Sequence, residues 1–125
     1  MKRVTGIGGI FFKANDPEAL MRWYREHLGI ELDSQGYVCF EWREKDNLSR
    51  TGFTAWAPFP PDTDYFNPST KQFMVNYRVE NLDYVLEQLR KEGVRVEEKI
   101  QEEEYGRFAW LMDPEGNRIE LWEPT

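Results

Sequence analysis

The sequence predicts an α+β domain that contains the same strand–helix–strand–strand–strand unit twice. Two amphipathic helix patterns lie about 65 residues apart, and each follows one strand-like segment and precedes others. The chain has 125 residues, of which 40% are hydrophobic and 15% aromatic. This composition suits one packed core, because so many large rings offset the entropy lost when a chain of this length is ordered.

The first half is predicted to contain one helix among its strands. Residues 4–13 favour a strand through their β-branched and aromatic side chains, and the glycines within it indicate a bulge or a close approach to the backbone. Asn-Asp-Pro-Glu at 15–18 starts a helix with a capping side chain and a proline. Gly29 ends this helix, whose apolar stripe is Leu20, Tyr24 and Leu28. Two further strands are predicted over 37–42 and 52–57.

The second half repeats this order. Residues 71–80 are predicted to form a strand, and Asn81 caps a helix whose apolar face is Leu82, Val85, Leu86 and Leu89. Gly93 ends the helix. A turn at 113–116, with proline second and glycine fourth, joins the last two of three predicted strands, over 94–96, 105–112 and 117–122.

Residues 58–70 separate the two halves and hold four of the seven prolines. Proline removes the backbone donor that a strand needs, so this segment is predicted to be a linker or loop. We therefore predict a single domain over 1–125 with a first module at 1–57, a proline-rich linker at 58–70 and a second module at 71–125. Such a linker permits the modules to pair within one chain or between two chains.

Composition also argues against some classes of function. The net charge is −7 and no Lys/Arg-rich run occurs, which argues against a nucleic-acid partner. No stretch approaches the roughly 18 apolar residues of a membrane span, and no apolar segment follows the first three residues. The single Cys39 cannot form an intramolecular disulfide, which indicates a soluble cytoplasmic protein. Cys39 is predicted to be buried, His27 to lie at the surface, and the acidic stretch 97–104 to be a solvated loop or sheet edge.

Alternation along the strands divides their side chains between two faces. Ile10, Phe12, Tyr77, Ile119 and Leu121 suit the side covered by the helices. The opposite, inner face is then predicted to carry five rings, Phe11, Trp56, Phe108, Trp110 and Trp122, among the polar residues Lys13, Thr54, Asn76, Arg78, Arg118 and Glu120. A mostly apolar concavity with a few polar groups is typical of small-molecule sites, although the same rings would also suit a sandwich core or a dimer seam.

Three motifs carry a resemblance to a known family. They are Asn15-Asp-Pro-Glu-Ala-Leu20 with Trp23-Tyr-Arg25 and Leu28-Gly29, then Val79-Glu-Asn-Leu-Asp83, and finally Asp113-Pro-Glu-Gly-Asn-Arg-Ile-Glu-Leu121. With the paired βαβββ order, they resemble the vicinal oxygen chelate superfamily, which includes glyoxalases, bleomycin-resistance proteins and dioxygenases. The resemblance implies two tandem βαβββ modules that form a cup-shaped mixed sheet, often in a homodimer.

The resemblance also implies four positions for a divalent metal ion, and here they are Gly9, Thr54, Met74 and Glu120. Only Glu120 is a strong ligand, because glycine has no side chain, a threonine hydroxyl binds weakly and a thioether suits soft ions. We therefore expect a protein without a metal cofactor rather than a glyoxalase I or extradiol dioxygenase, while the family leaves a divalent ion open.

Three functions remain as alternatives. The first is a metal-free protein that binds a small organic molecule, like the drug-sequestering homodimers of the family, through Phe11, Trp56, Asn76, Arg78, Phe108, Trp110 and Trp122. The second is a lyase- or isomerase-type enzyme that uses Glu120, Tyr105 or Arg78 for proton transfer without a metal, with Glu120 as the candidate catalytic residue. The third is a glyoxalase-like metalloenzyme whose missing ligands come from Glu41 or another residue. In the metal-free case Glu120 is either a member of an ion pair or an anchor for a cationic or hydroxylated ligand.

Overall fold

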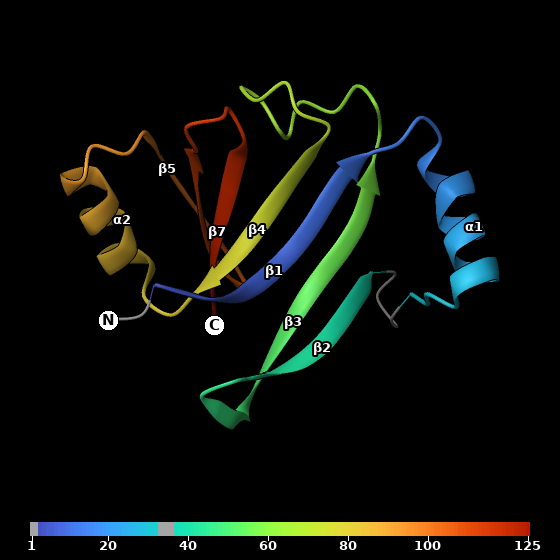
Figure 1. The fold of residues 1–125 in the computed structure, drawn as a ribbon, viewed down its shortest axis with the longest axis horizontal. Coiled ribbons are helices and arrows are strands. Elements are labelled where there is room, and N and C mark those ends of the chain that lie inside the picture. Colours follow the sequence, from blue (N-terminus) through green and yellow to red (C-terminus); the bar gives the residue numbers. More distant parts are fainter. Residues whose placement is uncertain (1–2, 33–36) are drawn as a thin grey trace.

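The computed structural model of the protein describes residues 3–32 and 37–125. Within these residues, seven strands form one mixed sheet in the order β2-β3-β1-β4-β7-β6-β5, accompanied by two helices (Figure 1). The elements are β1 (Val4–Lys13), α1 (Pro17–Leu28), β2 (Val38–Glu44), β3 (Asn47–Phe59), β4 (Phe73–Val79), α2 (Leu82–Lys91), β5 (Val96–Glu103), β6 (Gly106–Met112) and β7 (Arg118–Pro124). This confirms the predicted α+β fold class.

The two halves meet in the middle of the sheet. β1 pairs antiparallel with β4, and each is flanked by a parallel partner of its own half, β3 beside β1 and β7 beside β4. Figure 1 shows α1 and α2 at opposite sides of the molecule, with the 58–70 segment running between β3 and β4 at one end of the sheet. The two repeats therefore join within a single chain.

Local signals in the sequence fix both helices. The Asp16 carboxylate accepts a hydrogen bond from Ala19 N at 3.1 Å, and the Asn81 side chain accepts one from Tyr84 N at 3.0 Å. Gly29 and Gly93 follow the two helices with φ of 68° and 79°, the left-handed region that glycine enters without steric cost. The predicted helix starts and ends are confirmed.

The main apolar core lies between α2 and the second half of the sheet. Its buried members are Val79, Leu82, Val85, Leu86, Ala109, Leu111 and Leu121, and Tyr77 and Ile119 pack against them. The predicted helix-facing side of β4 and β7 is thus confirmed. No residue of α1 is buried in the same way.

Some predicted boundaries are wrong. The strand predicted over 94–96 runs instead from Val96 to Glu103, so most of the acidic stretch is the edge strand β5. β3 begins at Asn47, because the polar link before 52 forms a hairpin with β2. Cys39 is exposed rather than buried, since β2 is the other edge of the sheet. The repeat also implies a strand between α1 and β2; residues 29–32 form none, and residues 33–36 lie outside the described residues.

Candidate functional site

Glu120 is the centre of the polar contacts on the face of the sheet opposite the helices, which we call the cup face. β7 lies between β4 and β6, so Glu120 sits opposite Asn76 on one side and Trp110 on the other. Asn76 Nδ2 donates to Glu120 Oε1 at 2.6 Å, and Trp110 Nε1 donates to Oε2 at 2.9 Å. Glu120 is only 2% exposed, so strand register alone brings these three predicted residues into one buried network.

A fourth member of this network comes from the proline-rich segment. The Tyr65 hydroxyl donates to Glu120 Oε2. Burial, followed by the negative charge of Glu120, raises the pKa of the Tyr65 phenol well above its ordinary value. Tyr65 therefore keeps its proton and acts as a donor at neutral pH.

The same segment covers part of the cup face. Phe66 is fully buried in a cluster with Met74 and Trp110, and Phe11, Phe59 and Phe108 pack against that cluster. Arg118 Nη1 donates to Tyr65 O, and Ser69 Oγ donates to Gly116 O at 2.7 Å, which ties the segment to the second half. The prediction that 58–70 is only a linker or loop is incomplete, because residues 58–59 belong to β3 and the buried Phe66, with the half-buried Phe59 and Tyr65, packs against the sheet.

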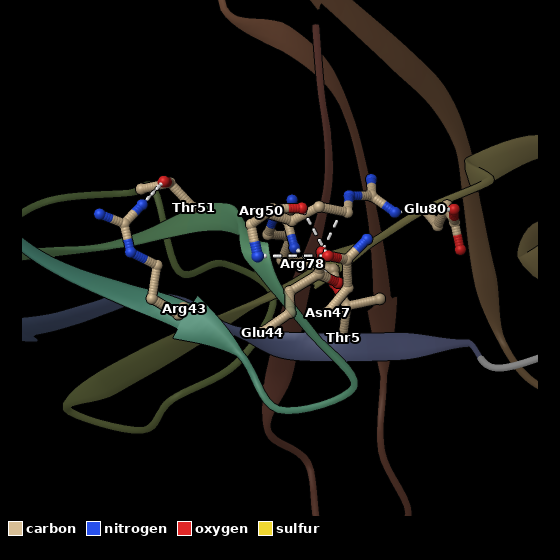
Figure 2. Close-up of polar contacts among 9 residues, drawn as sticks. Thr5, Arg43, Glu44, Asn47, Arg50, Thr51, Arg78 and Glu80 are labelled. Atoms are coloured by element: carbon tan, nitrogen blue, oxygen red, sulfur yellow. Dashed lines mark hydrogen bonds and ion pairs between the residues drawn. The ribbon is translucent and has the colours of Figure 1, made fainter.

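The cup-face arginines are paired with other acids. Arg118 makes a two-pronged ion pair with Glu97 at 2.8 and 2.9 Å, and its guanidinium lies 5.0 Å from the Trp110 ring. Arg78 is nine-tenths buried, lies 3.5 Å from Glu44 and donates to Thr5 Oγ1 at 3.1 Å (Figure 2). Among the described residues, no ion pair includes Glu120. The ion-pair alternative for Glu120 stays a prediction, as does its alternative role as an anchor for a ligand.

The Arg78 pair belongs to a wider charged cluster at the β2–β3 hairpin. Figure 2 shows Glu44 between two guanidinium groups, those of Arg78 and Arg50, and Arg50 Nε lies 2.9 Å from Glu44 Oε2. The indole of Trp42 covers the same region, since its ring lies 5.6 Å from the Arg78 guanidinium. This cluster fastens the hairpin of the first half to β4 of the second.

Trp56 is not on the cup face. Its ring centroid lies 5.2 Å from that of Phe12 and 4.9 Å from that of Tyr24 on α1. β1 and β3 are parallel neighbours in which Ile10 stands opposite Trp56, so the two side chains share the helix-covered face. The predicted orientation of Trp56 is wrong, because a strand's alternation alone does not say which of its two faces meets the helix.

The remaining predicted rings form a stack beside Glu120. Phe108 and Trp122 are half-buried, with ring centroids 6.2 Å apart and planes 5° from parallel. Tyr105 meets Phe108 edge-on, and its backbone carbonyl accepts a hydrogen bond from Trp122 Nε1 at 2.9 Å. Burial and the charge of Glu103 raise the pKa of the Tyr105 phenol, with smaller contributions from Tyr37 and Glu120. Tyr105 thus stands at the outer end of this stack.

Gly8 lets β1 pack closely against Asn76 and Trp122 next to this stack. The pairing of β1 with β4 shifts register between Ile7 and Gly9, which confirms the bulge expected from the glycines. A Cβ at position 8 would lie 2.3 Å from Asn76 Oδ1 and 2.9 Å from Trp122 Cε3. Only glycine fits here. Asn76 is 2% exposed, and among the described residues its Oδ1 has no hydrogen-bond partner.

The residues at the family's metal positions do not fit a divalent ion. Gly9 offers no side chain, and Met74 is fully buried against Phe66 and Trp110. Thr54 Oγ1 is held by two hydrogen bonds, one donated to Ile7 O and one accepted from Trp42 Nε1. No group of three or more His, Cys, Asp or Glu side chains that could hold a metal ion occurs among the described residues. Glu41, the suggested extra ligand, instead lies on the surface 3.4 Å from Arg43. Metal-free function itself stays a prediction.

An open groove that the sequence did not predict lies elsewhere. It has a volume of about 770 Å³ and runs between the start of α1 and the 58–70 segment. Its lining includes Trp23 and Tyr24 from α1, Lys13 from β1, and Pro61. Of the predicted cup-face residues, only Lys13 contributes to it.

No helix among the described residues is long and apolar enough to cross a membrane.

Solved structures of other proteins have a fold similar to that of this chain. A crystal structure of methylmalonyl-CoA epimerase from Mycobacterium tuberculosis has a TM-score of 0.64 and 22% identity, covering 100% of this chain and 91% of that one. Streptomyces coelicolor methylmalonyl-CoA epimerase, solved as a variant with 2-nitronate-propionyl-CoA, has a TM-score of 0.68 and 17% identity. The match covers 98% of this chain and 99% of that one. An NAD-dependent benzaldehyde dehydrogenase from Legionella pneumophila has a TM-score of 0.60 and 12% identity. The match covers 94% of this chain and 98% of that one. At such identities the likeness shows the fold alone. No curated protein sequence matches the chain.

The fold defines a two-repeat α+β protein with a ring-lined inner face. A family model for the Glyoxalase/Bleomycin resistance protein/Dioxygenase superfamily matches residues 6–121. The chain belongs to this superfamily, as the resemblance implied.

Proposed function

We propose that the protein binds a small organic molecule on the cup face, beside Glu120 and without a metal ion. One observation carries the proposal: Glu120 is a buried carboxylate held by three uncharged donors, Asn76, Trp110 and Tyr65. A buried charge is costly unless hydrogen bonds compensate it. The protein keeps the Glu120 carboxylate at this buried position despite that cost. The rings of Phe11, Phe108 and Trp122 beside it supply apolar contact area for a ligand.

The assembly belongs to the same proposal. We propose a homodimer in the cytoplasm, built of modules 1–57 and 71–125. Exposed apolar side chains of the first half support a partner surface, since Trp23 is 50% and Leu28 61% exposed.

Binding is tested by tryptophan fluorescence and thermal shift with a panel of planar aromatic compounds. We expect at least one compound to quench fluorescence saturably and to raise the melting temperature, because a ligand that binds only the folded state stabilises it. Trp122→Phe is expected to weaken the quenching, whereas the matched change Trp23→Phe on α1 is not. A protein purified without chelators that contains stoichiometric metal, or equal losses in both variants, would contradict the proposal.

A second candidate is an isomerase-type enzyme, favoured by one contact. An acid and a base that are hydrogen-bonded to each other occur on the cup face, because Tyr65 donates to Glu120. Glu120 would accept the proton from a carbon next to a carbonyl, leaving an enolate, and would then return a proton to that carbon. The fold neighbours that are methylmalonyl-CoA epimerases make methylmalonyl-CoA the first compound to test.

This enzyme function predicts exchange of the substrate's α-proton for deuterium in D2O. The exchange is followed by NMR and should disappear in Glu120→Gln. Persistence of exchange in that variant would reject Glu120 as the base. Absence of exchange with the intact protein would leave simple binding as the function.

A further inference from the structure

The open groove between α1 and the 58–70 segment is separate from the centre of the cup face and carries two opposite charges. Its volume of about 770 Å³ lies within the range of about 300–1,000 Å³ that is usual for ligand sites. Among the described residues that line it, only Lys13 and Asp16 are charged. These two side chains form no ion pair with each other in the described part of the chain. The groove therefore offers one cation and one anion, each still open to a partner.

Lys13 differs from the other partly buried basic residues. Every other lysine or arginine that is at least half-buried within residues 3–32 and 37–125 forms an ion pair, and these are Arg3, Arg78, Arg107 and Arg118. Lys13 forms none, and its Nζ lies 5.8 Å from the centroid of the Phe66 ring. An ammonium group has three donors, and a half-buried charge gains from an opposite charge. A ligand carboxylate in the groove would supply that charge.

Asp16 has acceptor positions to spare on the other side. Its Oδ1 accepts the capping hydrogen bond from Ala19 N at 3.1 Å, and the carboxylate forms no ion pair with a described residue. A carboxylate can accept about four hydrogen bonds. Asp16 is exposed, so a ligand ammonium can reach it without displacing the cap.

Two aromatic rings form the apolar wall of the groove. Tyr24 is held edge-on against Trp56 with ring centroids 4.9 Å apart, and Trp23 is held edge-on against Tyr24 at 5.2 Å. Trp23 is nevertheless 50% exposed, so much of its indole is free for contact with a ligand ring.

The backbone around the groove is also fixed. Lys13 N donates to Gln72 O, and Ala14 N donates to Phe59 O, both at 2.8 Å. These bonds tie the end of β1 to the chain on both sides of it. The charged and aromatic parts of the groove are therefore positioned before a ligand arrives, which lowers the entropic cost of binding.

We infer that this groove binds an amino acid with an aromatic side chain. The carboxylate of the amino acid pairs with Lys13, its ammonium group pairs with Asp16, and its ring packs against Trp23. Such a ligand has no net charge, so the protein's charge of −7 does not repel it. This second site does not depend on binding at the cup face.

A ligand with only one charge fits the groove less well. A carboxylate alone would pair with Lys13 but add a second negative charge beside Asp16, and an ammonium alone would add a positive charge beside Lys13. The two side chains together therefore select a ligand that carries both charges.

The test compares three probes that differ in their charged groups: L-phenylalanine, 3-phenylpropanoate, which lacks the ammonium, and 2-phenylethylammonium, which lacks the carboxylate. Their dissociation constants are measured by calorimetry at pH 7 and low salt. We expect L-phenylalanine to bind about three- to tenfold more tightly than either of the others, because only it pairs with both side chains in this open groove. Added salt should reduce this preference.

Two variants assign the contacts. Lys13→Gln and Asp16→Asn should each remove the preference for L-phenylalanine over the probe that lacks the matching charge, and asparagine at position 16 still caps α1. Lys71→Gln and Glu18→Gln remove the same charges at exposed positions outside the groove and should leave the dissociation constants unchanged.

Tryptophan fluorescence locates the bound probe. L-phenylalanine should change the emission, and this change should vanish in Trp23→Phe and persist in Trp122→Phe, the reverse of the result expected for a ligand of the cup face. Equal affinities for the three probes, no binding of any of them, a preference that survives in Lys13→Gln or Asp16→Asn, or a signal lost only in Trp122→Phe would overturn the inference. The cup-face proposal is tested separately by its own panel of aromatic compounds.

Discussion

The two halves of the molecule share one chain order but differ in how firmly their helices are packed. α2 contributes three buried residues, Leu82, Val85 and Leu86, to a core under the second half of the sheet. α1 contributes none, although it carries an apolar stripe and a good cap. The 58–70 segment adds to the imbalance, because its Tyr65 and Phe66 pack against the second half as well. A repeated sequence pattern therefore fixes element order without fixing packing, and the second half holds most of the buried apolar core.

The largest expected effect is that of Phe66→Ala. Phe66 is fully buried between Met74 and Trp110, so its removal is expected to lower the free energy of unfolding by about 3–5 kcal/mol. Phe53→Ala in the first half, where the ring is exposed, is expected to cost less than about 1 kcal/mol. Urea unfolding measures both. Similar costs for the two would mean that the 58–70 segment is not part of the core.

A matched pair of helix variants tests the two halves directly. Leu86→Ala in α2 removes a buried side chain and is expected to cost about 2–5 kcal/mol. Leu20→Ala in α1 removes only a half-buried one and is expected to cost clearly less in the same urea titration. If Leu20→Ala proves as costly, then α1 is packed in solution, and a partner chain becomes the first explanation to examine by sedimentation.

Tyr65→Phe probes the contact between the 58–70 segment and Glu120. Losing the hydroxyl leaves a buried carboxylate oxygen with one donor fewer, at an expected cost of about 1–3 kcal/mol. Chemical unfolding at pH 7 checks it. Tyr24→Phe on α1 provides the control in the first half, and an equal loss there would contradict the role given to the Tyr65 hydroxyl.

Alkaline pH should affect the second half through the same residue. The pKa of Tyr65 is raised in the folded protein, so the folded state holds this proton more tightly than the unfolded chain does. The resulting stability is complete below the ordinary tyrosine pKa of about 10 and declines as pH rises above it. Absorbance at alkaline pH should show one tyrosine fewer ionising before unfolding, and this difference should vanish in Tyr65→Phe. Ionisation of Tyr65 together with the exposed tyrosines would contradict it.

The smallest expected effect compares the two caps. Asp16→Ala and Asn81→Ala each remove one hydrogen bond at a helix start, and each is expected to cost about 1 kcal/mol or less. The loss at Asn81 should be seen in global unfolding, because α2 covers the core. The loss at Asp16 should instead appear as faster amide exchange within α1 alone. Global destabilisation by Asp16→Ala would show that the halves are coupled more evenly than their packing indicates.

Sequence patterns predicted the parts of this molecule that depend on local chemistry. The caps at Asp16 and Asn81, the left-handed Gly29 and Gly93, and the helix-facing Leu121 all follow from a few neighbouring residues. Glu120 was identified from its motif, and strand register places Asn76 and Trp110 beside it.

Sequence patterns failed where the outcome depends on which strands become neighbours. Trp56 was assigned to the wrong face, because its orientation follows from pairing with β1 and not from alternation within β3. The sequence did not predict Tyr65 as a donor to Glu120. The prediction for its segment relied on the high proline content and gave no weight to the aromatic residues there. A cluster of three aromatics within 59–66 was the available signal. The role of Gly8 could not be predicted from the sequence, because it depends on Asn76 and Trp122, which lie against it in the fold.

A crystal structure of the protein with the compound of the aromatic panel that binds most tightly tests the central claim most directly. The account predicts the compound on the cup face with its ring against Trp122, and Tyr65 still bound to Glu120 Oε2. A metal ion ligated by Glu120, or the compound seated only in the groove beside Trp23 and Tyr24, would contradict it.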